Sequence, residues 1–341
     1  MSIKKALLVL LACAFAVSAA FVSGTKEGAA SAATKAPDKL ACIGVIHPYF
    51  FPMKNAVEDF SKATGISAIY QATKDFDMEE ENTIIDGLTP QGYNGFALWP
   101  GHPYSVNVTI AALKKRGIPV ILVGGQAHLP TDAALCIATD VAASAAEGAK
   151  QVIKAMGDKG NLVDILGMLS DPNTLLRKAA IEKVVSQHPN VHLLATISDT
   201  DAFEAATAKI PPYFAAHWDQ IDGAITTAYV AAVVTSQYLT KRKNDHIKFV
   251  GIDEDQKVLD AISQGYVLGT MTQAPYMQAY LGLEGVHLLR AGYTVKPGKY
   301  FIDSGYFLLD KSNLATWQDI IKQRTQKMMD SFQSEYFDPP K

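Results

Sequence analysis

Short apolar runs that read as strands alternate with stretches of helical periodicity along most of this 341-residue chain. The runs are rich in Val, Ile and Leu, as strands buried on both faces of a parallel sheet are. Strands are expected at residues 43–46, 66–71, 95–98, 119–123, 136–139, 162–165, 191–197, 223–226, 248–251 and 267–272. Alternating strands and helices favour parallel sheets with right-handed crossovers. Since about ten strands exceed one ordinary sheet, we expect an α/β protein with two doubly wound lobes.

The first expected strand ends in an unusual way. His47 and Pro48 stop the apolar run, because Pro48 cannot donate to a strand ladder, and Tyr49, Phe50 and Phe51 follow. In open α/β sheets ligands bind at this edge, where a strand passes into its helix. Loops at such an edge lie on the surface, so we expect three exposed rings that form a platform for a ligand with apolar faces. Core packing remains the alternative for each ring.

The N-terminus has the pattern of an export signal. Lys4 and Lys5 precede an apolar stretch, Ala6 to Val22, and small residues follow. Residues 1–33 are therefore expected to be a signal peptide and linker, so we expect an exported protein, and the family resemblance described below implies the periplasm. An uncleaved anchor is the alternative, but the stretch is short for a bilayer span. Lipidation at Cys13 is the weaker alternative, because the apolar run continues past it.

Charge and cysteines narrow the functional classes. The formal net charge is -3, so no basic surface points to nucleic acid. Cys42 and Cys136 fall in the first and last expected strands of the first sheet, several strands apart. A disulfide requires Cα atoms within about 7 Å. We therefore expect two buried free thiols with no metal or redox role.

Catalytic and cofactor motifs are missing from the sequence. It contains no Gly-rich phosphate loop, no HExxH zinc motif and no GxSxG elbow, and its histidines lack metal-ligand spacing. The cluster Asp253-Glu254-Asp255 could be a cation or acid–base site. For Glu254 and Asp255 a polar loop that caps the helix at Gln256 is favoured. We therefore expect no enzyme, no cofactor, no metal and no catalytic residue.

Several short segments, in order, match one family. The chain resembles the periplasmic sugar-binding proteins of ABC importers, of the ribose/galactose-binding type, over nearly all of Leu40 to Leu309. The matching segments are residues 47–51, Trp99-Pro100, 117–121, 138–140, 173–180, 250–253, 264–273 and 303–313. The resemblance implies the type I periplasmic binding protein fold, in which two lobes close on a ligand and the closed form docks on a membrane permease.

The same resemblance implies a division of the chain. Residues 40–140 plus 274–300 would form the N-terminal lobe, and residues 141–273 plus 301–312 the C-terminal lobe. Residues 313–341 would be a C-terminal helix and tail. Three crossover segments near Asp140, Gln273 and Tyr300 would act as the hinge. Residues 300–309 alternate like one late-added strand.

The resemblance also implies ligand-binding residues. Tyr49 and Phe50 fall on ring-stacking positions, since sugar C–H faces are apolar. Arg177 falls on an arginine that forks onto ring and hydroxyl oxygens, with a surface helix charge as the alternative. Asp253 falls on a carboxylate that accepts from sugar hydroxyls, and Gln273 on an amide at the crossover.

Departures from the family pattern matter equally. Gly124-Gly125 stand where ribose and galactose binders usually carry a charged pair, and Ala228-Tyr229 replace an Asn-Asp pair. The space could be filled by His47, Trp99, Gln126 and Tyr229. The pocket would then be more aromatic and less charged than a ribose site. Ribose itself is therefore a poor fit, and a modified sugar, a polyol or another small polar molecule stays open. The expected ligand-binding residues are His47, Tyr49, Phe50, Trp99, Gln126, Asn173, Arg177, Tyr229, Asp253 and Gln273.

Three functions remain in competition. The favoured one is a monomeric solute receptor that delivers a monosaccharide, modified sugar or polyol to an ABC permease. The second is a sensor subunit that presents such a ligand to a chemoreceptor or sensor kinase. The third is an exported enzyme, which would need a catalytic constellation that the sequence does not display.

Overall fold

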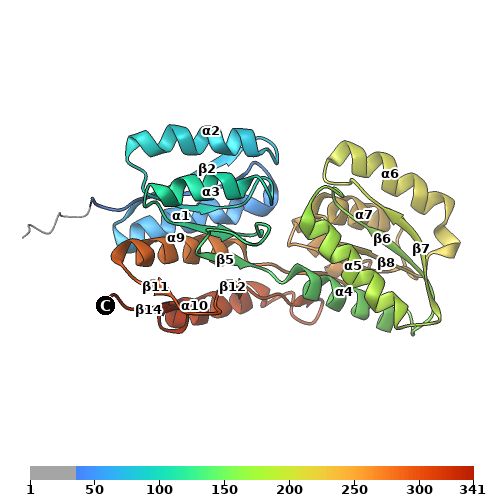
Figure 1. Cartoon of the computed structure of the whole chain (residues 1–341). Helices are drawn as coiled ribbons and strands as arrows, with labels where there is room; N and C mark the ends of the chain where they lie inside the picture. Colours follow the sequence, from blue (N-terminus) through green and yellow to red (C-terminus); the bar gives the residue numbers. More distant parts are fainter. Residues whose placement is uncertain (1–35) are drawn as a thin grey trace, which may run out of the picture. The chain divides into compact units, whose positions relative to one another are not determined.

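The computed structural model describes residues 36–341 (Figure 1). The expected export signal and Cys13 lie outside these residues. Within them, no helix combines the length and apolar character that a membrane span needs.

The first sheet contains six strands in the order β12-β5-β4-β3-β1-β2, all parallel to their neighbours. Helices α1 and α9 pack on one face around Phe60 and Leu283, and α2 and α3 pack on the other around Ile85 and Ile110 (Figure 1). We call this sheet with its helices the first lobe. Its elements are β1 (Lys39–Val45), α1 (Phe51–Thr64), β2 (Ser67–Thr73), α2 (Met78–Leu88), β3 (Gly95–Leu98), α3 (Val106–Lys115), β4 (Val120–Val123), β5 (Leu135–Ala138), α9 (Pro275–Ala291) and β12 (Phe301–Asp303).

The second sheet has the order β13-β10-β9-β8-β6-β7, and only β13 is antiparallel to its neighbour. Helices α4 and α5 cover one face, and α6, α7 and α8 cover the other. We call this sheet with its helices the second lobe. Its elements are α4 (Val141–Ala155), β6 (Gly160–Ile165), α5 (Pro172–Ser186), β7 (Val191–Ile197), α6 (Phe203–Ala216), β8 (Gly223–Thr226), α7 (Tyr229–Lys241), β9 (Lys248–Ile252), α8 (Gln256–Gln264), β10 (Gly269–Met271) and β13 (Leu308–Asp310).

The α/β class with two doubly wound sheets is confirmed, and every strand expected from the apolar runs is found. The segment 300–309 differs from expectation, because it forms two strands instead of one. β12 pairs with β5, so residues 301–303 belong to the first sheet, and only β13 joins the second. The third crossover is consequently Ser304–Phe307 and not the region of Tyr300. The segment divides between the two sheets because Ile302 is buried in the hydrophobic core of the first lobe.

The C-terminal segment packs on the first lobe. Helix α10 (Trp317–Tyr336) contacts α9, and β14 (Phe337–Asp338) pairs with β11 (Thr294–Val295). Phe332 and Phe337 are buried in the same core as α1 and α9. Both described cysteines are buried free thiols, Cys42 on β1 and Cys136 on β5, with β3 and β4 between them.

Candidate functional site

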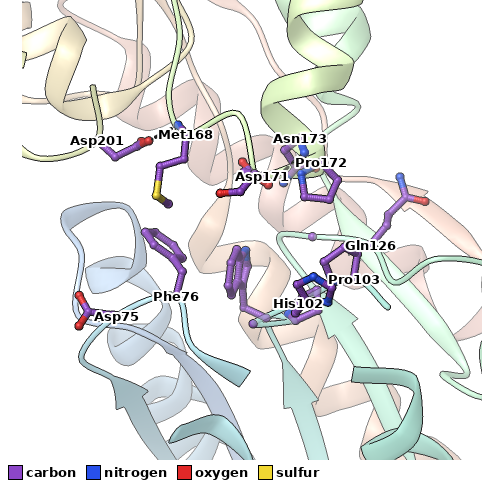
Figure 2. A pocket seen from close by; sticks show the side chains of 15 residues that line it. Asp75, Phe76, His102, Pro103, Gln126, Met168, Asp171, Pro172, Asn173 and Asp201 are labelled. Atoms are coloured by element: carbon purple, nitrogen blue, oxygen red, sulfur yellow. Dashed lines mark hydrogen bonds between the residues drawn. The ribbon is translucent and has the colours of Figure 1, made fainter. Parts of the chain in front are cut away.

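Two adjoining cavities are lined by segments that follow strands of both sheets. The inner cavity, of about 80 Å³, is lined by loops after β1, β3 and β4 and, from the second lobe, by α5 and the loops after β8, β9 and β10. The outer cavity, of about 320 Å³, lies beside it (Figure 2). Phe76, Trp99, Asp171, Asn173 and Asp201 line both. The two cavities therefore share a wall made of these five residues.

The segment after β1 is a short 3-10 helix, Pro48–Phe50, whose N-cap is His47. Its Nδ1 accepts a hydrogen bond from the Tyr49 backbone N–H at 3.2 Å. The expected platform of three exposed rings is wrong. Phe50 is only 2% exposed and packs edge-on against Tyr49 and Trp99, while Phe51 is exposed on α1 and lines neither cavity. The helical turn points successive rings in different directions, so only Tyr49 and the edge of Phe50 reach the inner cavity.

Tyr49 is tied to the crossover segments. Its hydroxyl donates to Gln278 Oε1 at 2.9 Å, and Gln278 Nε2 donates to the hydroxyl of Ser304 at 2.9 Å. The Thr139 and Ser304 hydroxyls lie 3.2 Å apart. Burial raises the pKa of Tyr49 well above its usual range, so its hydroxyl keeps the proton. The aromatic ring in the inner cavity is thus held by residues from two of the three crossovers.

Trp99 takes the place left by the missing charged pair. Gly124 has φ +72°, and a Cβ there would lie 3.1 Å from Trp99 Cδ1. A Cβ on Gly125 would lie 3.3 Å from Trp99 Nε1. The two glycines therefore let the indole pack against the backbone after β4. A side chain at either position would press on the indole.

Helix α5 brings Asn173 and Arg177 to the inner cavity from the second lobe. Asp171 caps the helix by accepting from the Asn173 N–H at 3.0 Å, so the start of the helix is fixed. Among residues 36–341, no hydrogen bond joins the Arg177 guanidinium to another side chain or to the backbone. Its donors are therefore available to oxygen atoms of a ligand.

Asp253 lies at the end of β9 in the left-handed region, with φ 65°. Such a conformation is costly for a residue other than glycine and often marks a binding site. Its Oδ1 accepts from Gln273 Nε2 at 2.8 Å, and both side chains are buried. Burial raises the pKa of Asp253, and the Gln273 hydrogen bond and the Arg177 charge oppose this shift. The carboxylate is thus held next to a cation without a direct hydrogen bond to it.

The cluster contains two other carboxyl groups, Glu254 and Asp255, and Asp255 has a structural role. Asp255 caps α8 by accepting from the Lys257 N–H at 2.8 Å, which confirms the expected loop and cap. It also accepts from the Tyr229 hydroxyl at 2.8 Å. Burial, and next the charge of Asp253, raise the pKa of Glu254. Across residues 36–341, no group of three His, Cys, Asp or Glu side chains is arranged to hold a metal ion.

His47 and Tyr229 meet across the inner cavity, with ring centroids 5.5 Å apart in an edge-on arrangement. Burial lowers the pKa of His47 to about 4. The imidazole is therefore neutral at neutral pH. Since its Nδ1 accepts from the backbone, the proton is assigned to Nε2, which can donate to a ligand.

All expected ligand-binding residues except Gln126 line the inner cavity, and Gln126 lines the outer one. Their contact with a ligand stays a prediction. Sequence reasoning missed Phe76 and Asp201, which follow β2 and β7. The rule that ligand residues follow strand ends could have found both, because an aromatic ring and a carboxylate stand just after apolar strands there.

Comparisons with known proteins show the family of this chain. The family model described as a periplasmic binding protein domain matches residues 40–292. A xylitol-binding protein from Mycolicibacterium smegmatis is 24% identical over 277 residues, which cover 81% of this chain and 78% of that protein. A D-apiose import binding protein from Paraburkholderia graminis is 25% identical over 291 residues, 83% of this chain and 91% of that protein.

The fold matches solved structures as well. A solute-binding protein of an ABC transporter from Burkholderia graminis, in complex with D-arabinose, superposes with a TM-score of 0.75 at 20% identity. The match covers 82% of this chain and 97% of that chain. A similar protein from Actinobacillus succinogenes with bound D-allose gives a TM-score of 0.74 at 18% identity, covering 82% and 99%. The resemblance expected from the sequence is confirmed.

Proposed function

The chain belongs to the periplasmic binding protein family, whose members are receptors and not enzymes, and from this premise we propose that it captures a neutral sugar or polyol for an ABC permease. One observation carries the proposal. The inner cavity combines the rings of Tyr49, Trp99 and Tyr229 with the donors of Arg177 and the acceptor of Asp253. Rings suit apolar C–H faces, and the charged pair suits a hydroxylated rim.

The size and charge of the inner cavity narrow the ligand. Its volume of about 80 Å³ is small, and it is lined by the guanidinium of Arg177 and by the carboxyl groups of Asp171, Asp201 and Asp253. A pentose or pentitol without a net charge suits such a site better than a larger or anionic solute. The related proteins named for xylitol and D-apiose support this choice, since both ligands are small and uncharged.

Binding would draw the lobes together. The ligand would rest on Tyr49 and Trp99 of the first lobe, while Arg177 and Asp253 of the second would donate to it and accept from it. Rotation would occur at the three crossovers, and the closed form of a monomer would dock on the permease. The family is periplasmic. We propose that cleavage of the signal peptide releases the mature chain into the periplasm, and that Cys13 does not carry a lipid anchor.

Titration calorimetry with D-arabinose, D-xylose, D-ribose and xylitol tests the proposal. Charge-assisted hydrogen bonds contribute about 1.5–3 kcal/mol each, so losing two of them in Arg177→Ala should weaken the best ligand about 100-fold or more. Arg116→Ala is the matched control, because Arg116 is exposed at the end of α3 and lines neither cavity. An unchanged affinity in Arg177→Ala would contradict the proposal that Arg177 binds the ligand.

A further inference from the structure

The outer cavity is larger than the inner one, with about 320 Å³ against about 80 Å³, and five residues line both. A ligand that filled the inner cavity alone would leave most of this space to water. We propose that the outer cavity is a second subsite, which takes a flat ring joined to the sugar that the inner cavity holds. This inference rests on the proposed function and specifies its ligand as a glycoside without negative charge.

The walls of the outer cavity suit a ring with apolar faces. Phe76 and Trp99 pack together with ring centroids 5.1 Å apart and planes inclined by 59°. Figure 2 shows the side chain of Met168, from the second lobe, directed toward the ring of Phe76. Pro100, Pro103 and Pro172 add further apolar surface. Aromatic and thioether groups on opposite sides favour a planar group between them.

The charges of the outer cavity exclude one class of ligand. Asp75, Asp171 and Asp201 line it, and no lysine or arginine is among its lining residues. Asp201 Oδ2 accepts from the Met168 N–H, and Asp171 Oδ1 accepts from the Asn173 N–H at 3.0 Å. A carboxylate accepts more than one hydrogen bond, so both can still accept from hydroxyl or amino groups. A phosphate or carboxylate on the second ring would be repelled.

The loop beneath the outer cavity is held in place by a buried side chain. Glu81 is 1% exposed, and its Oε2 accepts from the Gly101 N–H at 2.7 Å. A Cβ on Gly101 would lie 2.8 Å from this oxygen, so the loop packs closely on α2. The Pro103 carbonyl also accepts from the His128 N–H at 2.8 Å. These contacts hold the loop from Trp99 to Pro103 in a fixed position along the outer cavity.

Calorimetry with matched ligands separates the two subsites. The probes are D-arabinose, D-xylose and D-ribose, the phenyl pyranoside of each, and the corresponding pentose phosphates. We expect the phenyl pyranoside of the best pentose to bind about 10-fold more tightly than the pentose, because the phenyl group stacks in the outer cavity. The phosphate should bind more weakly than the pentose.

Two variants test which cavity provides the tighter binding of the phenyl pyranoside. Met168 lines only the outer cavity, so Met168→Ala should remove most of the gain from the phenyl group and leave the affinity for the free pentose unchanged. Its matched control is Leu169→Ala, since Leu169 is exposed and lines neither cavity. Arg177→Ala, in the inner cavity, should weaken pentose and pyranoside alike.

The outcomes distinguish this inference from the proposed function. If pentoses bind and Arg177→Ala abolishes binding, but phenyl pyranosides bind no more tightly, the second subsite is wrong and the receptor function stands. Equal losses for pentose and pyranoside in Met168→Ala would also overturn the subsite. Tighter binding of a pentose phosphate would overturn the exclusion of anions. If no sugar or polyol binds, both proposals fail.

Discussion

At the scale of single residues, the second lobe contains a carboxyl group that the proposed function does not use. Asp164 lies on β6, is fully buried, and neither of its oxygens has a hydrogen-bond partner among the described residues. Burial raises its pKa to about 7, with Lys178 opposing the shift. The folded protein therefore favours the protonated form of Asp164 over the charged one.

Asp164→Asn should change how stability depends on pH. Because the folded pKa of Asp164 lies above its ordinary value of about 3.8, the wild type loses free energy of unfolding as the pH rises from about 4 to about 7. The variant lacks this loss, so at pH 8 its free energy of unfolding should exceed that of the wild type by up to about 4 kcal/mol. At pH 4 the difference should be far smaller.

Urea unfolding at a series of pH values measures this difference. Asp86→Asn is the control, because Asp86 is exposed on α2 and its replacement should leave the pH profile unchanged. A difference between Asp164→Asn and the wild type that stays constant from pH 4 to pH 8 would contradict the assignment.

At the scale of elements, the turns after strands decide which side chains reach the site. The turn after β4 begins with Gly124 in the left-handed region, and Trp99 from the turn after β3 packs against it. The sequence showed that the usual charged pair was missing there. It did not show that an indole takes the space, because that contact joins residues on two separate turns.

Gly124→Ala tests this packing, with Gly117→Ala as its matched control. Both glycines have φ close to +70°, but a Cβ on Gly117 would meet nothing within 4 Å, whereas one on Gly124 would press on Trp99. Both variants should lose about 1 kcal/mol through backbone strain. Gly124→Ala should lose more and should also weaken ligand binding, because the indole must shift. Equal losses in chemical unfolding and unchanged affinity would contradict this packing.

At the scale of the whole molecule, three crossovers join the lobes, and Gln278 connects two of them to the site. It is fully buried on α9 and bonds to Tyr49, Ser304 and, at 3.4 Å, Thr139. Two crossovers and the Tyr49 ring of the inner cavity therefore share one hydrogen-bond network. A substitution that breaks this network should therefore lower the free energy of unfolding and weaken ligand binding.

Gln278→Ala should lower the free energy of unfolding by about 1–3 kcal/mol, since it removes the acceptor of the buried Tyr49 hydroxyl and the amide that donates to Ser304. It should also weaken sugar binding, because Tyr49 loses its acceptor. Gln264→Ala, an exposed position at the end of α8, is the control. Urea unfolding and calorimetry on the same preparations measure both effects. A variant as stable as the wild type would show that water or a neighbour replaces the amide.

The sequence by itself determined the strand and helix order, the two parallel sheets, the family and most residues of the inner cavity. The element order and the sheets follow from local periodicity, whereas the family and the residues of the inner cavity follow from the resemblance of short segments in their order along the chain. The resemblance also predicted that Arg177, Asp253 and Gln273 belong to one site, and all three line the inner cavity.

Only the tertiary structure decided which rings face the cavity and how far the cavity extends. Phe50 is buried and Phe51 exposed because a helical turn rotates successive side chains, which no count of aromatic residues reveals. Residues 300–309 divide between two sheets because Ile302 enters the first core. The outer cavity is lined by Phe76 from the first lobe and by Met168 from the second. Such contacts join residues distant in the chain, so local patterns contain no information about them.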